Sequence, residues 1–255
     1  MSQQPPPTHA AYFASLSEQL HAEPTEALTV ERICEQALEL VPDAHHCGVT
    51  LRRRRGRIET VVASHDVVAV CDALQYELDE GPCMEPRQDL GAFLVRDTAA
   101  DSRWPTWGAR AAELGIRSLL SVQLVAPSRN ESNAVLGALN LYDGRIGTFS
   151  RDDLDRTLLF ATHAASALAA AQKIDGLETA IHSRQLIGVA QGILMQRYGL
   201  TLDRSFEVMR RYSSDTNIKL RDVAQMVVDS RDLPDPSLPS PRKQLRATAE
   251  PLAPA

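Results

Sequence analysis

The sequence predicts an α+β protein, in which a mostly antiparallel sheet flanked by helices is followed by a small all-α bundle of three helices. Two observations lead to this prediction. Short apolar runs typical of strands alternate with helical patterns up to about residue 170. Beyond that point, apolar residues recur every three or four positions, in segments bounded by capping residues. A chain of 255 residues is long enough for two such units.

The first unit is expected at residues 24–170, after an N-terminal segment, 1–23, that is partly disordered because it opens with consecutive prolines. Strands that follow one another, with helices at both ends, predict antiparallel pairing and a sheet covered on one face. In chain order, the patterns predict a helix at 28–40, strands at 47–51 and 58–63, a short helix at 74–78, a strand at 93–95, a helix at 107–114, strands at 118–125 and 135–142, and a helix from Leu154 onward.

A long helix is expected to join the two units. No proline occurs between 152 and 198, so one helix of up to about 45 residues, roughly 65–70 Å long, can form there. Its apolar residues are spaced like a coiled-coil seam that stops and then resumes, which indicates a shift of register near Gly176. Two helices with a kink at Gly176 are the alternative. The seam residues are Leu154, Leu158, Ala161, Ala165 and Leu168, and then Ile174, Leu177 and Ile181.

The C-terminal bundle is expected at residues 171–232. Gly199 is suited to the left-handed position that ends a helix, and Thr201 to the cap of the next helix. Residues 213–216 indicate a turn, after which Asn217 is expected to cap the third helix. The apolar residues expected on the inner faces are Leu202, Phe206 and Met209 in the second helix, and Leu220, Val223, Ala224, Val227 and Val228 in the third.

Three short motifs of this bundle carry a resemblance to a known family. They are Ser-Arg at 183–184, Gly-Ile-Leu-Met at 192–195 and Leu-Arg-Asp-Val-Ala at 220–224. On these motifs the unit resembles an ANTAR domain, the three-helix RNA-binding module of transcription antitermination regulators. The resemblance implies binding to paired RNA stem-loops that favour an antiterminator over a terminator. The family often has Lys where this chain has Gln191, so one charge directed at a phosphate is missing.

Polar and basic side chains on the outer faces of the bundle are the candidate RNA contacts. Between 173 and 231, nine basic residues stand against seven acidic ones, which is too weak a balance for a general nucleic-acid binder. RNA loops, however, are recognised by shape, stacking and base-edge hydrogen bonds as well as by charge. Ordinary solvated helix faces are the alternative interpretation. The candidates are Arg184, Gln191, Arg197, Asn217 and Lys219.

The first unit carries a second resemblance, through the runs 79–83, 115–118 and 136–142 and through its order of elements. It resembles a GAF domain, which implies a sensory pocket beside the sheet, usually for a small molecule. The sequence does not indicate which cofactor, if any, the GAF-like unit binds. Core packing is the alternative for both tryptophans, and a small buried hydrophobic residue is the alternative for the cysteine. The candidate pocket residues are Cys83, Arg103, Trp104 and Trp107.

Composition excludes several classes of protein. The net charge of −6 argues against a protein that coats nucleic acid or a membrane surface. No segment approaches the roughly 20 apolar residues that a membrane helix needs. No secretory signal is recognisable, and the four cysteines contain no Cys-x-x-Cys pair, as expected of reduced thiols in the cytoplasm. His45 and His46 lack a second group of ligands, so no metal site is predicted. The proline-rich tail, 233–255, is expected to be disordered.

Together these observations predict a cytoplasmic bacterial regulator that is not an enzyme. It is expected to be a homodimer that binds tandem RNA stem-loops and acts as an antiterminator under control of the GAF-like sensor. One alternative is a GAF-fold thiol enzyme of the methionine sulfoxide reductase type using Cys71 and Cys83, although no cysteine follows Cys83. The other is a protein-interaction module without RNA binding. The arginine run 52–55 is expected at an exposed hairpin tip, with solvation favoured over RNA contact.

Overall fold

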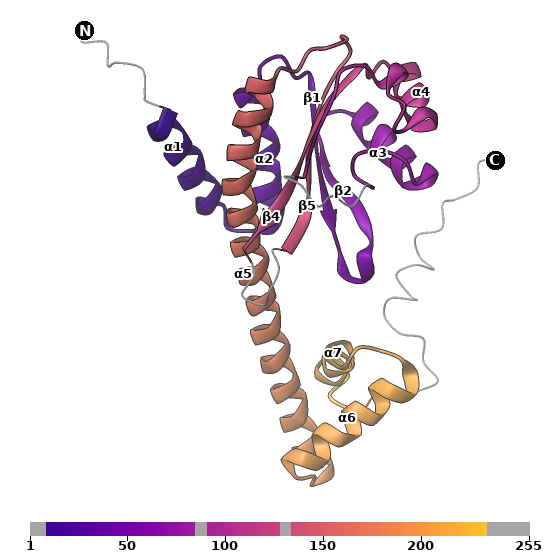
Figure 1. Cartoon of the computed structure of the whole chain (residues 1–255). Helices are drawn as coiled ribbons and strands as arrows, with labels where there is room; N and C mark the ends of the chain where they lie inside the picture. Colours follow the sequence, from indigo (N-terminus) through magenta and orange to yellow (C-terminus); the bar gives the residue numbers. More distant parts are fainter. Residues whose placement is uncertain (1–8, 85–90, 128–133, 234–255) are drawn as a thin grey trace, which may run out of the picture. The chain divides into compact units, whose positions relative to one another are not determined.

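The computed structural model describes residues 9–84, 91–127 and 134–233. The chain divides into two compact units, Met1–Asp175 and Gly176–Ala255. Unit 1 contains a sheet and the helices on its faces, and unit 2 is helical (Figure 1). The predicted α+β class is therefore confirmed.

The sheet of unit 1 has five strands in the order β2-β1-β5-β4-β3, and every neighbouring pair is antiparallel. All five predicted strands are present, within two residues of their expected ends. The strands are β1 (His46–Arg52), β2 (Ile58–Ala63), β3 (Ala92–Val95), β4 (Ser118–Ala126) and β5 (Ala134–Asp143).

Helices cover both faces of this sheet, so the prediction of one covered face was wrong. Leu119 and Leu120 of β4 point to opposite faces, and both are fully buried. Leu120 belongs to a core with α2 and α5, and Leu119 to a second core with α3 and α4 (Figure 1). Near-continuous apolar runs such as that of β4 are the signature of a strand buried on both sides. The helices of unit 1 are α1 (His9–Ala22), α2 (Glu26–Leu40), α3 (Asp66–Leu78), α4 (Pro105–Glu113) and the first part of α5 (Arg151–Tyr198).

Two helices extend beyond the predictions. Helix α1 lies in the expected N-terminal segment, where no helix was predicted, and buries Phe13, Leu16 and Leu20 in the core beside α2 and α5. Helix α3 starts at Asp66, eight residues before the predicted 74–78 helix. His65 caps it, because its side chain accepts a hydrogen bond from the Val67 backbone N–H.

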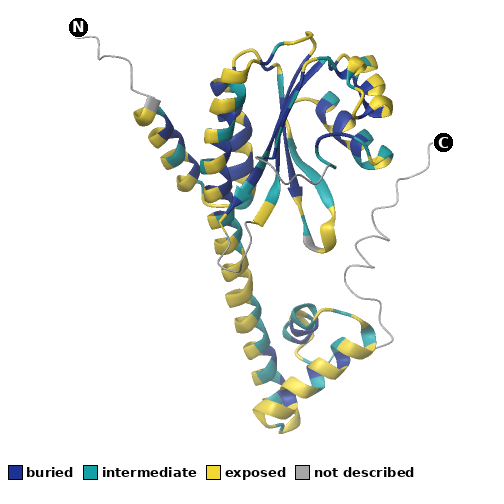
Figure 2. Cartoon of the chain, viewed as in Figure 1, coloured by how far each residue is buried: buried dark blue, intermediate teal, exposed yellow. Residues whose placement is uncertain are grey.

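Helix α5 is continuous from Arg151 to Tyr198, so the alternative of two helices kinked at Gly176 is wrong. Its apolar face is used differently along its length. Ala161, Ala165 and Leu168 are buried in the core of unit 1, where the predicted seam packs within its own unit. The second set of seam residues, Ile174, Leu177 and Ile181, is 50–55% exposed (Figure 2). We call these three residues the α5 stripe.

Unit 2 packs the C-terminal part of α5 with α6 (Leu202–Thr216) and α7 (Leu220–Ser230). Gly199 has the predicted left-handed backbone, with φ of 63°, and the Thr201 hydroxyl accepts the Arg204 N–H as predicted. The fully buried residues of its core are Ala190, Leu194, Met209, Val223, Ala224 and Val227, with Tyr212 nearly so.

Two predictions for α6 were wrong. Residues 213–216 continue the helix, and Asn217 ends it in the left-handed conformation, with φ of 54°, so Lys219 lies at the cap position of α7. Asparagine tolerates that backbone almost as well as it caps a helix, so its presence alone does not distinguish the two ends. The inner face is predicted correctly only at Met209, which is fully buried. Leu202 is 58% and Phe206 38% exposed, while Ser205 is buried, its hydroxyl donating to the Leu202 carbonyl.

Candidate functional site

In unit 2, the first turn of α7 and residues 178–186 of α5 border an open groove of about 460 Å³. Its walls carry an imidazole, a guanidinium, an amide, hydroxyls and two carboxylates around the apolar Leu186. Such a surface offers donors, acceptors and a flat ring, the groups that read unstacked RNA bases. The lining residues are Glu178, Thr179, His182, Ser183, Leu186, Arg221, Asp222 and Gln225.

The basic residues of unit 2 fall into two groups. Arg197, Arg204 and Arg211 are paired with carboxylates, at N–O distances of 2.5 Å to Asp232, 3.1 Å to Glu207 and 3.7 Å to Asp215. Arg221 is likewise paired with Asp222, at 3.2 Å. Within the part of the chain that the structure describes, the exposed side chains of Arg184, Arg210, Lys219 and Arg231 form neither an ion pair nor a hydrogen bond. These four cations are therefore available to an external anion at no cost in broken pairs. Arg210 and Arg231 were not among the predicted contacts.

The five predicted RNA contacts do not form one cluster. Lys219 and Asn217 lie at the start of α7, whereas Arg197 contacts Asp232, just beyond its end. The 11 residues of α7 separate these two ends by about 16 Å. The Gln191 side-chain amide donates a hydrogen bond to the Leu202 carbonyl at 3.0 Å. The Tyr198 hydroxyl hydrogen-bonds the Asp232 carboxylate, which also holds Arg197. Arg184 and Lys219 are thus the unengaged cations among the five.

In unit 1, the two predicted pocket tryptophans lie in the packed core around α4, and the exposed Arg103 lies beside them. Trp107 is fully buried and donates its indole N–H to the Cys71 carbonyl at 3.2 Å. Trp104 is 5% exposed and packs edge-on against Trp107, with the Arg103 guanidinium 4.5 Å from its ring centre. Arg103 also pairs with Asp101 at 2.6 Å. The contacts of the two tryptophans are those of core packing.

The fourth residue, Cys83, lines a small cavity of about 20 Å³ on the α3 side of the sheet, room for about one water molecule. The Asn140 amide N–H₂ lies 3.1 Å from the Cys83 sulfur, and the buried Asn140 Oδ1 has no hydrogen-bond partner among the described residues. The structure thus separates Cys83 from the two tryptophans. The other lining residues are Thr50, Arg52, Ile58, Pro82, Gln123, Val135, Gly137 and Ala138.

Asp72 is the centre of a buried polar cluster that sequence reasoning missed. This fully buried carboxylate of α3 accepts hydrogen bonds from Tyr142, from Thr60 at 2.7 Å and from Gln75 at 3.2 Å. Burial raises the pKa of Asp72, and these hydrogen bonds oppose the rise. An aspartate among the apolar residues of a helix was the available signal. The cluster joins α3 to the sheet on the side where a GAF-type pocket is expected.

The thiols of this region are poorly suited to catalysis. Burial raises the pKa of Cys71, and it raises the pKa of Cys83 to about 12. The thiolate is the reactive form, so both groups are almost wholly protonated at neutral pH. This observation counts against the thiol-enzyme alternative.

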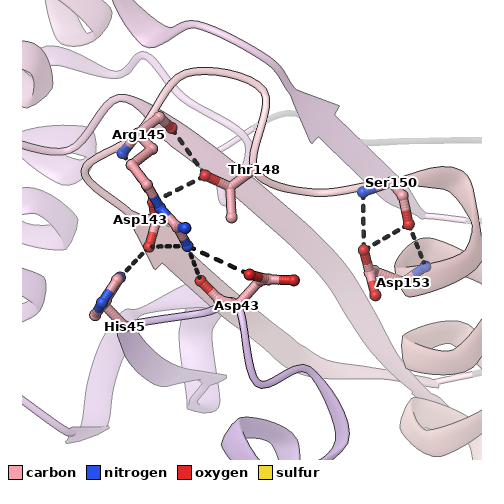
Figure 3. A network of polar contacts seen from close by, with 7 residues as sticks. All are labelled: Asp43, His45, Asp143, Arg145, Thr148, Ser150 and Asp153. Atoms are coloured by element: carbon pink, nitrogen blue, oxygen red, sulfur yellow. Dashed lines mark hydrogen bonds and ion pairs between the residues drawn. The ribbon is translucent and has the colours of Figure 1, made fainter.

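A second polar network holds the turn that follows β5, and a separate pair of residues caps the start of α5 (Figure 3). Asp143, buried at the end of β5, accepts hydrogen bonds from His45, from Arg145 at 2.9 Å and from Thr148 at 2.8 Å. Burial alone would raise the pKa of Asp143, but these hydrogen bonds hold it well below its usual range. Seven residues later, the Ser150 hydroxyl accepts the Asp153 N–H at 3.2 Å and caps α5.

His45, His46 and His65 border an open groove beside this network. Over residues 9–84, 91–127 and 134–233, no three or more His, Cys, Asp or Glu side chains form a group that could hold a metal ion. In the same residues, no helix is long and apolar enough to cross a membrane.

Comparison with known proteins assigns both units. Residues 24–169 match the GAF domain family and residues 175–228 match the ANTAR domain family. The chain belongs to the GAF domain family, and its GAF domain is followed by an ANTAR domain. GAF domains are sensor modules and ANTAR domains are regulatory RNA-binding modules, so the architecture is that of a signal-responsive regulator.

Among solved structures, one with a TM-score above 0.5 shares the fold. A bacteriophytochrome from the photosynthetic bacterium R. palustris aligns with a TM-score of 0.52 and 11% identity, over 82% of this chain and 48% of its own. The chain thus spans about half the length of that protein. The GAF domain of an Acinetobacter phosphoenolpyruvate-protein phosphotransferase aligns with a TM-score of 0.47 and 12% identity, over 66% of this chain and 97% of its own. No curated protein matches the chain.

Proposed function

We propose that this chain is a bacterial, cytoplasmic RNA-binding regulator whose ANTAR domain binds RNA stem-loops and thereby acts as a transcription antiterminator. The observation that carries the proposal is the ANTAR match over residues 175–228. The free cations Arg184, Arg210 and Lys219 and the groove between α5 and α7 support it, because they offer phosphate and base contacts on one small unit.

The α5 stripe supports a homodimer. Ile174, Leu177 and Ile181 are spaced by three and four residues, and each is about half exposed. Side chains with this spacing form the seam when two helices pair. A dimer presents two ANTAR domains, so a tandem pair of hairpins gains affinity through effective concentration. The GAF domain controls this presentation in response to a small molecule.

The proposal is tested by filter binding of the purified protein to a tandem hairpin RNA, a single hairpin and double-stranded DNA at physiological salt. Tight binding to the tandem hairpin, with weaker binding to the single hairpin and to DNA, is expected. Equal or absent binding to all three would contradict the proposal. The helical bundle would then be assigned to protein interaction.

A further inference from the structure

The β1–β2 hairpin ends in an unusually basic segment that the proposed function leaves unused. Five of the six residues from 52 to 57 are arginine, in a chain whose net charge is −6. The strands are closed by a hydrogen bond from the Arg53 N–H to the Arg57 carbonyl. We call Arg52, Arg53, Arg55 and Arg57 the arginine tip.

Half of the arginine tip is neutralised within the chain. The Arg53 guanidinium lies 2.5 Å from Glu26 and 2.7 Å from Glu59, and Arg57 pairs with the same Glu59. Arg52 and Arg55 are exposed and have no ion pair among the described residues. The two glutamates therefore neutralise Arg53 and Arg57 and leave the guanidinium groups of Arg52 and Arg55 without an opposite charge in the described part of the chain. Arg52 also borders the small cavity at Cys83.

The backbone conformation of Arg55, at the apex of the hairpin, indicates that an arginine at this position does not stabilise the fold. Arg55 has φ of 65° and ψ of 23°, the left-handed conformation that L-residues with a Cβ adopt at a cost. Gly56 follows with φ of 76°. Glycine or asparagine would satisfy the Arg55 backbone more cheaply, and no described side chain compensates arginine there. A backbone conformation that costs free energy at an exposed position is typical of functional sites.

We infer that the arginine tip binds RNA phosphates, as a second and sequence-independent contact surface outside the ANTAR domain; this inference rests on the proposed RNA binding. The guanidinium fork fits two phosphate oxygens at once. Arg52 and Arg55 are exposed at the end of the β1–β2 hairpin, where the phosphates of a nucleic-acid backbone can reach them. Phosphate contacts of this kind add affinity and orientation without reading bases.

The test compares wild-type protein with R52Q/R55G and with the control R110Q/R156Q. The control removes the same charge from unit 1, but its exposed arginines are already paired with Glu113 and Asp152. RNA affinity is measured from 0.05 to 0.4 M salt, on a hairpin with single-stranded flanks. For R52Q/R55G we expect the slope of log K against log salt to be shallower by about 1.4–1.8, since each lost phosphate contact accounts for about 0.7–0.9. The control slope is expected to stay at the wild-type value.

The melting temperature of R52Q/R55G distinguishes a binding role of the arginine tip from a structural one. Because glycine relieves the left-handed Arg55 backbone, R52Q/R55G is expected to melt at or above the wild-type temperature. Equal slopes for R52Q/R55G and the control would overturn the inference and leave the proposed function intact. A wild-type protein that binds no RNA would overturn both. Loss of binding to polyglutamate but not to RNA would assign the tip to an acidic protein and overturn the inference.

Discussion

The two stretches of α5 share one helix and have opposite surroundings. The first stretch, 151–171, buries Phe160, Ala164 and Leu168 completely in the core of the GAF domain. The second, 174–189, leaves Ile174, Leu177, Ile181 and Val189 at least half exposed (Figure 2). Apolar spacing is similar in both, so spacing alone does not say whether a seam is filled from within the chain. The exposed stretch is the one for which we propose a second protomer as partner.

The largest expected effect comes from the first stretch. Leu168→Ala removes a fully buried side chain and should lower the free energy of unfolding by about 2–5 kcal/mol, through lost burial and a cavity. Leu159→Ala is the control on the same stretch, because Leu159 is 47% exposed and should change stability by only about 0.5 kcal/mol. Urea unfolding followed by circular dichroism measures both. Similar losses for the two variants would contradict the difference in burial.

The second-largest effect is expected at Asp143, in the polar network that follows β5. Asp143→Asn weakens the charged hydrogen bonds from Arg145 and His45 and should cost about 1–3 kcal/mol at pH 7. Because the folded-state pKa of Asp143 is depressed, its contribution is complete above the unfolded value of about 3.9 and is lost as the pH falls below it. The stability gap between wild type and variant should therefore narrow below about pH 4. A gap that is constant from pH 7 to pH 3 would show that ionisation of Asp143 is irrelevant.

In unit 2, charge reversal should act on binding and leave folding unchanged. R184E/K219E replaces two unpaired exposed cations and should weaken RNA binding by about tenfold to a hundredfold. R204E/R211E is the matched control, because both arginines are already paired with carboxylates on α6. Filter binding with circular dichroism spectra distinguishes lost contacts from lost structure. Unchanged affinity of a folded R184E/K219E protein would remove both residues from the interface.

At the α5 stripe, the expected effect is on assembly, with little effect on folding. I174S/L177S/I181S changes half-exposed side chains, so each substitution should cost about 0.5 kcal/mol or less in the isolated protomer. The same variant should convert a dimer to a monomer in light scattering after gel filtration, while the exposed control Ala180→Ser remains dimeric. A wild-type protein that is already monomeric would exclude the α5 stripe as a dimer interface.

Local signals in the sequence predicted the fold well where one residue type has one use. Gly199 and Thr201 mark the break between α5 and α6 because a left-handed stop and a hydroxyl cap each depend on a single residue. Asn217 was misassigned because asparagine suits both ends of a helix. The near-continuous apolar run of β4 was a local signal for a second covered face, but the helices that bury Leu119 and Leu120 are distant in sequence, and the signal was missed.

The candidate site was harder to predict than the fold. The motifs at 183–184 and 220–224 lie on the two helices that border the groove of unit 2, but only side-chain geometry shows that Arg197 is held by Asp232 and that Arg184 is free. The Asp72 cluster is assembled from α3, β1, β2 and β5, and no local pattern relates these segments. Ion pairing and burial are properties of the folded chain, and spacing does not encode them.

The most direct test of a dimeric RNA-binding regulator is the ratio of affinities for tandem and single hairpin RNA, measured for wild type and for I174S/L177S/I181S at physiological salt. The wild-type protein is expected to bind the tandem RNA at least tenfold more tightly, as two linked modules do. The stripe variant should bind both RNAs with the affinity of the wild type for a single hairpin. A tandem preference that survives in a monomeric variant would contradict binding by two ANTAR domains linked through the α5 stripe.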